Sequence, residues 1–533
     1  MSPAEPADLI LAGGVIHTVD PSRIRAEAVA VRGDRIVHVG SREEAMRMKG
    51  PHTRLVELDG RTVVPGLTDA HGHVTGLGLS LEKLDLVGTA SAEAIGRMVA
   101  DKARGLPAGR WIRGRGWDQN DWDDKAFPSR LALDAAAPEH PVALERIDGH
   151  ATWANTIAMR LAGVSAETPD PPGGRIVRDE KGEPTGVFID TAEELILSRI
   201  PPPTRDEARA AIRASMTRCL SSGLTSVHDA GVSQVELGIY EEILVDGDFP
   251  FRIYAMLSDD GDLQEALRKG PRIGLGDHRL TVRSIKLYID GALGSRGAAL
   301  IEPYTDDSGN VGLVMMEAGR LRSFAARAGL LGFQLAVHAI GDRGNRIVLD
   351  AIEAAKVSRD ARFRIEHGQI IAPEDIPRFA ALGVIASMQP THATSDMYWA
   401  GDRLGADRLG GAYAWKSILR SGARLACGSD FPVESERPIL GFHAAVTRQD
   451  AKRWPEGGWR PEEKLSREEA LRCFTLDAAY AAFEEDLRGS ISVGKLADFT
   501  VLSRDIMAVP EEEILGTEIE MTVVGGRIAY ERR

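Results

Sequence analysis

The sequence predicts an α/β protein: a (β/α)8 TIM-type barrel, a small β-sandwich domain formed by both termini, and an inserted subdomain after the first barrel strand. Three observations predict this fold. Short runs rich in β-branched residues alternate with helical stretches through the middle of the chain, and both ends are rich in short strands. A gap of about 150 residues separates the first two predicted barrel strands.

Both ends of the chain carry strand patterns. Residues 28–32 and 35–39 flank Gly33-Asp34, which is typical of a hairpin with a glycine-containing turn. The C-terminus repeats this kind of pattern over residues 522–530. Because two β-rich ends enclose a middle of different character, we expect residues 1–62 and 488–533 to form one domain.

The middle of the chain, residues 63–487, is predicted to form the barrel. Helical patterns over residues 205–221, 318–328, 344–355 and 373–381 lie between strand patterns, which indicates repeated βα units and a parallel sheet. In such a barrel the chemistry lies at the C-terminal ends of the strands. The eight predicted strands are residues 62–67, 224–227, 251–256, 282–288, 333–337, 363–365, 384–388 and 424–426.

The long segment after the first strand is predicted to be an inserted subdomain, from about residue 81 to about residue 200. It holds two stretches rich in turn residues, 169–174 and 181–186. Long insertions at a catalytic face usually shape the substrate pocket. The insertion also contains four tryptophans: Trp111, Trp117, Trp122 and Trp153.

Composition narrows the possible partners. Lys and Arg number 65 and Asp and Glu number 79, which gives a net charge of −14 and argues against nucleic acid or an anionic membrane as a partner. No basic region precedes an apolar stretch at the N-terminus, and no apolar run reaches the length of a membrane span. The three cysteines are widely spaced and form no CxxC pair. We therefore expect a cytoplasmic protein with a small-molecule substrate.

Chemically active side chains follow several of the predicted strands, and these form the candidate site. Imidazole and carboxylate groups suit Zn²⁺, and the two histidines of an HxH motif lie on the same side of an extended chain. Because strand ends meet on one rim of the barrel, we expect the side chains to converge there. In chain order they are His71, His73, Lys286, His338, His367 and Asp430.

Lys286 needs a separate explanation, because an ammonium group would repel a metal. A lysine at the centre of a barrel is desolvated, which lowers its pKa. The neutral amine could then add CO₂ and become a carbamate, an anionic ligand able to bridge two metals. The alternative is an ordinary ion pair between Lys286 and the nearby Asp290.

This set of residues resembles the binuclear site of the amidohydrolase superfamily. The opening 63–73 and the return 489–499 also look like that superfamily. Four further motifs are similar to its YtcJ-like, or amidohydrolase-3, branch, which includes N-substituted formamide deformylase. They are Gly116-Trp117-Asp118-Gln119-Asn120, Asp148-Gly149-His150, residues 290–296 and Gln389-Pro390-Thr391-His392.

The resemblance implies a role for each ligand. His71, His73 and Asp430 would hold the more buried metal, His338 and His367 would hold a second, and carboxylated Lys286 would bridge them. Two Zn²⁺ ions per chain and a hydrolase that cleaves a C–N bond with an activated water are expected from it. Asp430 would take the proton of that water and pass it to the leaving amine.

Five further residues are candidates for substrate binding. His392 follows the seventh strand, and His228 follows the second, where a structural role is equally open. Trp117 and His150 lie in the insertion, although a tryptophan there is more often a core residue. Arg296 would bind an anionic group of the substrate or pair with the nearby Asp290.

Two alternatives remain open from the sequence. The first is a zinc deaminase of the same fold with a single metal, in which Lys286 stays unmodified. The second is a non-catalytic regulatory protein built on a hydrolase scaffold. A homodimer is also expected by resemblance.

Overall fold

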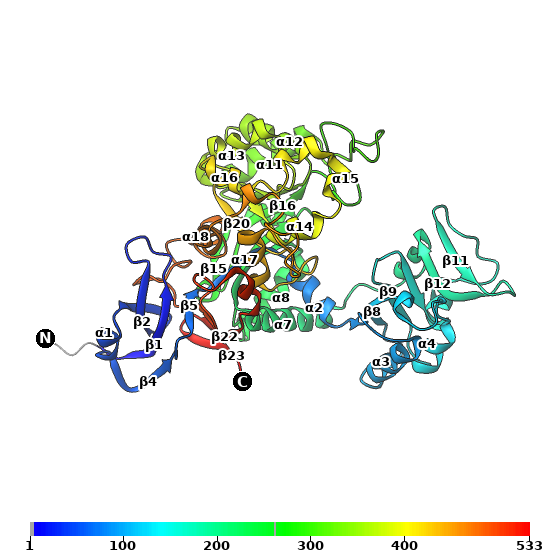
Figure 1. Ribbon diagram of the computed structural model, residues 1–533, viewed down its shortest axis with the longest axis horizontal. Helices are drawn as coiled ribbons and strands as arrows, with labels where there is room; N and C mark the ends of the chain where they lie inside the picture. The colour runs from blue at the N-terminus through cyan, green and yellow to red at the C-terminus, as the bar shows by residue number, and fades with distance from the viewer. Residues whose placement is uncertain (1–4, 261–262) are drawn as a thin grey trace. The chain divides into compact units, whose positions relative to one another are not determined.

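The computed structural model describes residues 5–260 and 263–533, so the first four residues of the predicted terminal domain lie outside the described residues. The chain divides into two compact units (Figure 1). Unit 1 comprises Met1–Gly76 and Ile212–Arg533, and unit 2 comprises Leu77–Ala211. Among the described residues, no helix has the length and apolar character needed to cross a bilayer.

Both ends of the chain contribute to one continuous sheet in unit 1. Its strand order is β23-β22-β21-β5-β1-β2-β3, and β4 pairs with β1. The N-terminal and C-terminal parts join where β5 pairs antiparallel with β21. The strands are β1 (Ala7–His17), β2 (Arg25–Arg32), β3 (Arg35–Gly40), β4 (Lys49–Glu57), β5 (Thr62–Pro65), β21 (Phe499–Leu502), β22 (Ile519–Val524) and β23 (Arg527–Glu531), with helix α1 (Arg42–Met46) between β3 and β4.

Alternation along β1 explains how this sheet buries both of its faces. Leu9 and Leu11 belong to one buried apolar cluster, whereas Ile10 and Ala12 belong to another. Successive side chains of a strand point to opposite faces, so each face of β1 packs against its own core. The predicted hairpin is present as β2 and β3, with Gly33 at φ 58° in its turn.

The prediction that residues 62–67 form the first barrel strand was wrong. Thr62–Pro65 is β5 of the terminal sheet, and the first barrel strand is β6 (Leu67–Gly72). The chain changes sheets at Pro65-Gly66, where proline offers no backbone N–H and Gly66 passes close to Thr225. A Cβ on Gly66 would lie 2.3 Å from the Thr225 hydroxyl oxygen.

Eight parallel strands form a nearly closed barrel in the order β20-β19-β18-β17-β16-β14-β13-β6. The other seven predicted strands each overlap one of these. A bridge between Gly72 and Phe431 joins β6 to the chain after β20. Besides β6, the strands are β13 (Leu224–Val232), β14 (Arg252–Ser258), β16 (Leu280–Tyr288), β17 (Gln334–Ala339), β18 (Arg364–His367), β19 (Ile385–Met388) and β20 (Leu425–Cys427), and the short β15 (Arg272–Gly274) pairs with β16.

Helices follow the strands as the βα pattern predicts, and all four predicted helices overlap observed ones. A capping box of Ser233 and Glu236 starts α8, which satisfies backbone N–H groups of its first turn. The helices are α2 (Val74–Leu81), α7 (Arg205–Ser221), α8 (Gln234–Val245), α9 (Leu263–Lys269), α10 (Leu275–His278), α11 (Ala318–Leu331), α12 (Asp342–Ala355), α13 (Ile376–Leu382), α14 (Pro390–Asp396), α15 (Ala400–Leu404), α16 (Trp415–Arg420), α17 (Pro438–Thr447), α18 (Arg467–Cys473) and α19 (Leu476–Ala481).

Unit 2 has its own sheet and its own core. The strand order is β11-β12-β10-β9-β8-β7, and buried tryptophans pack on it, with Trp117 6.2 Å from both Trp122 and Trp153 between ring centroids. The elements are β7 (Leu84–Asp85), β8 (Ile112–Trp117), β9 (Val142–Arg146), β10 (Ala151–Ala154), β11 (Gly174–Arg178), β12 (Pro184–Asp190), α3 (Ala92–Arg104), α4 (Arg130–Ala136), α5 (Thr156–Ala162) and α6 (Glu194–Leu197).

Candidate metal centre

Three of the predicted ligands converge at the end of the first barrel strand. His71 is the penultimate residue of β6, and His73 follows that strand. The Nε2 atoms of His71 and His73 lie 3.5 Å and 3.0 Å from Oδ1 of Asp430. One ligand atom from each of these residues falls within 4.8 Å of the others, which is close enough for all three to hold one metal ion.

The backbone fixes this convergence. The backbone N–H of Asp430 donates to the carbonyl oxygen of His71 at 2.7 Å, and Asp430 adopts a φ of 61°. The approach requires a glycine two residues earlier, because a Cβ on Gly428 would lie 2.5 Å from the backbone nitrogen of His71. The carboxylate of Asp69 accepts hydrogen bonds from the backbone N–H groups of His71 and Ser429, which ties both segments together.

Hydrogen bonds orient the two imidazoles for metal binding. The Nδ1 atom of His73 lies 2.8 Å from the carbonyl oxygen of Ala230, and Nδ1 of His71 hydrogen-bonds to Glu366. Because a carbonyl and a carboxylate only accept, each Nδ1 carries a proton, and Nε2 is the nitrogen that each ring directs at Asp430. Burial lowers the pKa of His71 to about 4, which keeps this ring neutral.

One unpartnered nitrogen atom indicates that these residues suit a metal ion. Within the described part of the chain, Nε2 of His71 is buried and has no hydrogen-bond partner. A buried polar atom without a partner is costly, and a bound cation would satisfy it. Burial alone would raise the pKa of Asp430, but the hydrogen bond from His73 holds it well below its usual value. Asp430 is therefore an anion and suits a cation.

A second possible ligand group shares Asp430. It consists of His367, His392 and Asp430, whose ligand atoms also lie within 4.8 Å of one another. Nδ1 of His367 lies 2.9 Å from the amide oxygen of Gln389, so its Nε2 is the nitrogen left to bind a metal. Nε2 of His392 lies 3.8 Å from Oδ2 of Asp430. This group includes His392, for which the sequence predicted a role in substrate binding.

His338 lies beside this second group. Its ring centroid is 4.5 Å from that of His367, and its Nε2 lies 3.7 Å from a carboxylate oxygen of Asp290. In the described structure this Nε2 is buried and has no hydrogen-bond partner. Burial lowers the pKa of His338 to about 3, with Lys286 adding to the effect, so the ring is neutral. His338 is therefore available as a ligand, although it is not part of either geometric group.

Lys286 is buried inside the barrel, and burial lowers its pKa to about 8. Its Nζ lies 4.1 Å from the ring centroid of Tyr288. The alternative ion pair with Asp290 is not formed, since the described structure holds no contact between these two groups. Asp290 instead accepts hydrogen bonds from the backbone N–H groups of Ala299, Ile340 and Gly341.

Two further candidates for substrate binding, His228 and Arg296, each contact another side chain of unit 1. His228 is buried in the barrel, and its Nδ1 accepts a hydrogen bond from Arg364 at 2.9 Å, which gives it a structural role. Arg296 forms a two-point ion pair with Asp306 at 3.0 and 2.9 Å.

Two of the candidates belong to unit 2. Trp117 has no exposed surface, and its indole N–H donates to the carbonyl oxygen of Leu144, so it is a core residue of unit 2. His150 is exposed and hydrogen-bonds to Asp190 at 2.8 Å.

The sequence analysis missed the polar residues that support the ligands. Arg364 and Glu366 are fully buried in β18 and hydrogen-bond to each other. The signal was the period-two spacing of two charged residues inside an apolar strand, directly before His367. Asp69 was also missed, although it stands two residues before His71.

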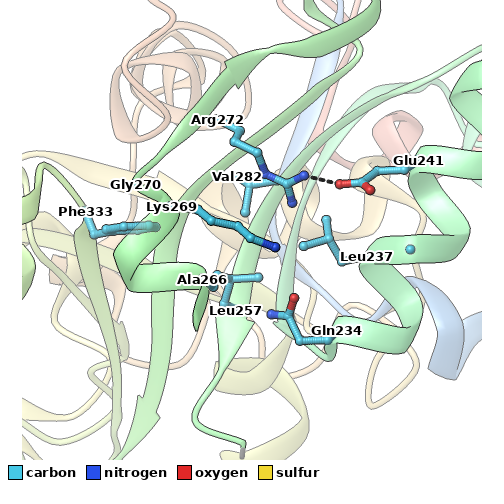
Figure 2. A pocket seen from close by; sticks show the side chains of 11 residues that line it. Gln234, Leu237, Glu241, Leu257, Ala266, Lys269, Gly270, Arg272, Val282 and Phe333 are labelled. Carbon is cyan, nitrogen blue, oxygen red and sulfur yellow. Dashed lines mark hydrogen bonds and ion pairs between the residues drawn. The ribbon is translucent and has the colours of Figure 1, made fainter. Parts of the chain in front are cut away.

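A separate cavity lies elsewhere in unit 1. Figure 2 shows this cavity of about 110 Å³ beside α8, with Arg272 and Glu241 joined by an ion pair in its wall. None of the candidate ligands lines it, so this cavity is not part of the metal centre.

Comparisons with known proteins agree with this geometry. Residues 54–530 match the family described as "Amidohydrolase family". The chain is 36% identical to the protein YtcJ of Bacillus subtilis over 98% of this chain and 99% of that protein. It is 30% identical to N-substituted formamide deformylase of Arthrobacter pascens over 98% of each chain. An uncharacterized metal-dependent hydrolase from Pyrococcus furiosus has a similar structure, with a TM-score of 0.78 and 30% identity over 94% of this chain and 99% of that chain.

Proposed function

This chain belongs to the amidohydrolase family of metal-dependent hydrolases, and from that premise we propose that it cleaves a C–N bond of a small organic molecule with an activated water. The bond is of the amide or formamide type. The observation that carries the proposal is the convergence of His71, His73 and Asp430 at the C-terminal end of the first barrel strand.

The proposed metals are two Zn²⁺ ions. His71, His73 and Asp430 would hold the first. His338 and His367 would hold the second, and Lys286 as a carbamate would supply an anionic ligand. Imidazole nitrogens and a buried carboxylate are a donor set that suits zinc. When bound, zinc acidifies water and polarises a carbonyl group, which is the chemistry that amide hydrolysis needs.

Lys286 is suited to carbamate formation because burial favours its neutral amine. The amine nitrogen attacks CO₂, a C–N bond forms, and one proton leaves the nitrogen. The product is an anion at the position where an ammonium group would repel cations.

Asp430 is the proposed proton carrier of the reaction. Its carboxylate lies at the meeting point of both ligand groups, where it can accept a proton from the attacking water. The same carboxyl group then donates that proton to the leaving amine nitrogen.

His392 is the proposed substrate-binding residue nearest to the reaction. Its Nδ1 lies 3.1 Å from the amide nitrogen of Gln369, which as a donor leaves the ring proton on Nε2. That Nε2–H faces the Asp430 side of the site, where it can donate to the substrate carbonyl oxygen as negative charge develops. A donor in this position stabilises the transition state.

The decisive experiment is a screen of N-acyl and N-formyl amines with zinc-loaded enzyme, with Asp430→Asn as a control. We expect at least one substrate whose hydrolysis a chelator abolishes and zinc restores. Activity on amino-substituted purines or pyrimidines with one zinc per chain would favour the single-metal deaminase. A folded chain that binds no zinc would overturn the proposal in favour of a non-catalytic protein.

A further inference from the structure

The metal ligand His71 stands at one end of a chain of buried polar groups that runs beneath the candidate site. Arg364, Glu366 and His228 are each 0% exposed, as is His71 itself. Buried charges persist in a barrel interior only where they are paired and fully hydrogen-bonded. Their arrangement therefore needs a reason beyond packing.

Arg364 is held by groups from four barrel strands. Its Nε donates to Oε1 of Glu366 at 2.7 Å, and its Nη2 donates to Oε2 of the same carboxylate at 3.1 Å. Nη2 also donates to the carbonyl oxygen of Ala70 and the hydroxyl of Ser387, and Nη1 donates to Nδ1 of His228. The guanidinium is thus fixed in one orientation.

The fixed guanidinium places a donor on each oxygen of Glu366, as on a carboxylate. A carboxylate has only acceptor sites, so the Nδ1 of His71 that contacts it must carry a proton. The other nitrogen of the ring, Nε2, is then left with a free lone pair that faces Asp430 at 3.5 Å.

We infer that Glu366, anchored by Arg364, is a positioning residue that fixes the tautomer of His71 and thereby prepares its Nε2 to bind the metal. His73 is set in the same way by a backbone carbonyl, which no substitution can change. Glu366 is the side-chain counterpart of that carbonyl. The inference rests on the proposed metal site.

Glu366→Gln is the sharpest variant because it changes one oxygen to an amide nitrogen. Arg364 offers only donors, so the glutamine oxygen turns toward the 2.7 Å contact with its Nε. The amide NH₂ then faces His71 and requires its Nδ1 to accept. The proton moves to Nε2, which can no longer bind a metal.

The test measures zinc affinity by competition with a chelator. We expect Glu366→Gln to weaken zinc binding about 10- to 100-fold, as loss of a ligand's hydrogen-bond partner usually does, and Glu366→Asp to restore part of it. The matched control is Asp498→Asn, which breaks a buried pair with Arg252 away from the site and should lower the melting temperature without changing zinc affinity.

A second measurement uses the parent protein, so the inference stays testable if the variants fail to fold. Nitrogen NMR of the metal-free protein with labelled histidine reports which ring nitrogen is protonated, and His71→Asn identifies the signal. We expect a proton on Nδ1 of His71. A proton on Nε2, or parent-like zinc affinity in Glu366→Gln, overturns the inference, whereas failure of the parent to bind zinc overturns the proposed function instead.

Discussion

The Nε2 atom of His73 and the Oδ1 atom of Asp430 lie 3.0 Å apart, although 357 positions separate these residues in the chain. The barrel brings them together because β6 and β20 are its first and last strands, and their C-terminal ends meet where the barrel closes. A metal ion bound here would therefore also link the two ends of the barrel.

Asp430→Asn tests the proposed ligand and proton carrier. Asparagine keeps the size of the side chain but removes its negative charge and its ability to accept a proton. We expect hydrolysis to fall by at least about 100-fold and the zinc content to drop. Metal analysis and initial rates on the best substrate of the screen would check this. Asp101→Asn, on an exposed helix of unit 2, should behave like the parent, and parent-like rates in Asp430→Asn would remove Asp430 from both roles.

Carboxylation of Lys286 is tested by loading the protein with ¹³C-labelled bicarbonate. We expect a carbamate signal in the carbon NMR spectrum of the parent and none in Lys286→Met, which should also bind about one zinc ion fewer. Lys416→Met removes a lysine that pairs with Glu469 and serves as the control. An unmodified Lys286 in the zinc-loaded parent would contradict the bridging role and favour a single metal.

Gly428→Ala tests the close approach of the two ligand-bearing segments. The new Cβ would lie 2.5 Å from the backbone nitrogen of His71, so the segments must move apart. We expect weaker zinc binding and a loss of about 1–3 kcal/mol of stability in denaturant unfolding. Gly319→Ala places a Cβ in open space on helix α11 and should stabilise the protein slightly. Unchanged zinc affinity in Gly428→Ala would show that the approach can relax.

His443 makes a pH-dependent contribution that is independent of the metal ligands. Burial lowers its pKa from 6.5 to about 4 in the folded chain. The unfolded chain therefore binds a proton at a higher pH, and stability falls as the pH drops from 6.5 toward 4. Between pH 7 and pH 5 the parent should lose about 2 kcal/mol more stability than His443→Gln in denaturant unfolding. The exposed His52→Gln should follow the parent, and identical pH profiles for His443→Gln and the parent would refute the assignment.

Much of the architecture was predictable because repeated local patterns encode it. Alternation of short apolar runs with helical stretches predicted seven of the eight barrel strands. The exception, residues 62–67, is an apolar run that two different sheets share. Only the paired partners of each half, Phe499–Leu502 and Leu224–Val232, separate β5 from β6. A local sequence pattern does not say which strands pair with each other. The boundary between β5 and β6 could therefore not be predicted from the sequence.

The residues of the site also fall into those that the sequence predicts and those that it does not. The placement of His71 and Asp430 at strand ends follows from the order of elements along the chain. Their supports depend on which strands become neighbours and which way side chains turn inside the barrel. Glu366 contacts His71 only because β18 and β6 face each other across the barrel interior.

The sequence by itself determined the fold class, the strand ends that carry His71, His73, Lys286 and Asp430, and the family resemblance, because these depend on local periodicity and short motifs. Tertiary structure alone decided that His392 lies beside Asp430 and that Trp117 is a core residue. It also decided that Asp290 accepts hydrogen bonds from backbone N–H groups and forms no ion pair with Lys286. Contacts between distant strands and loops set these outcomes, and their free energies exist only once the chain has folded.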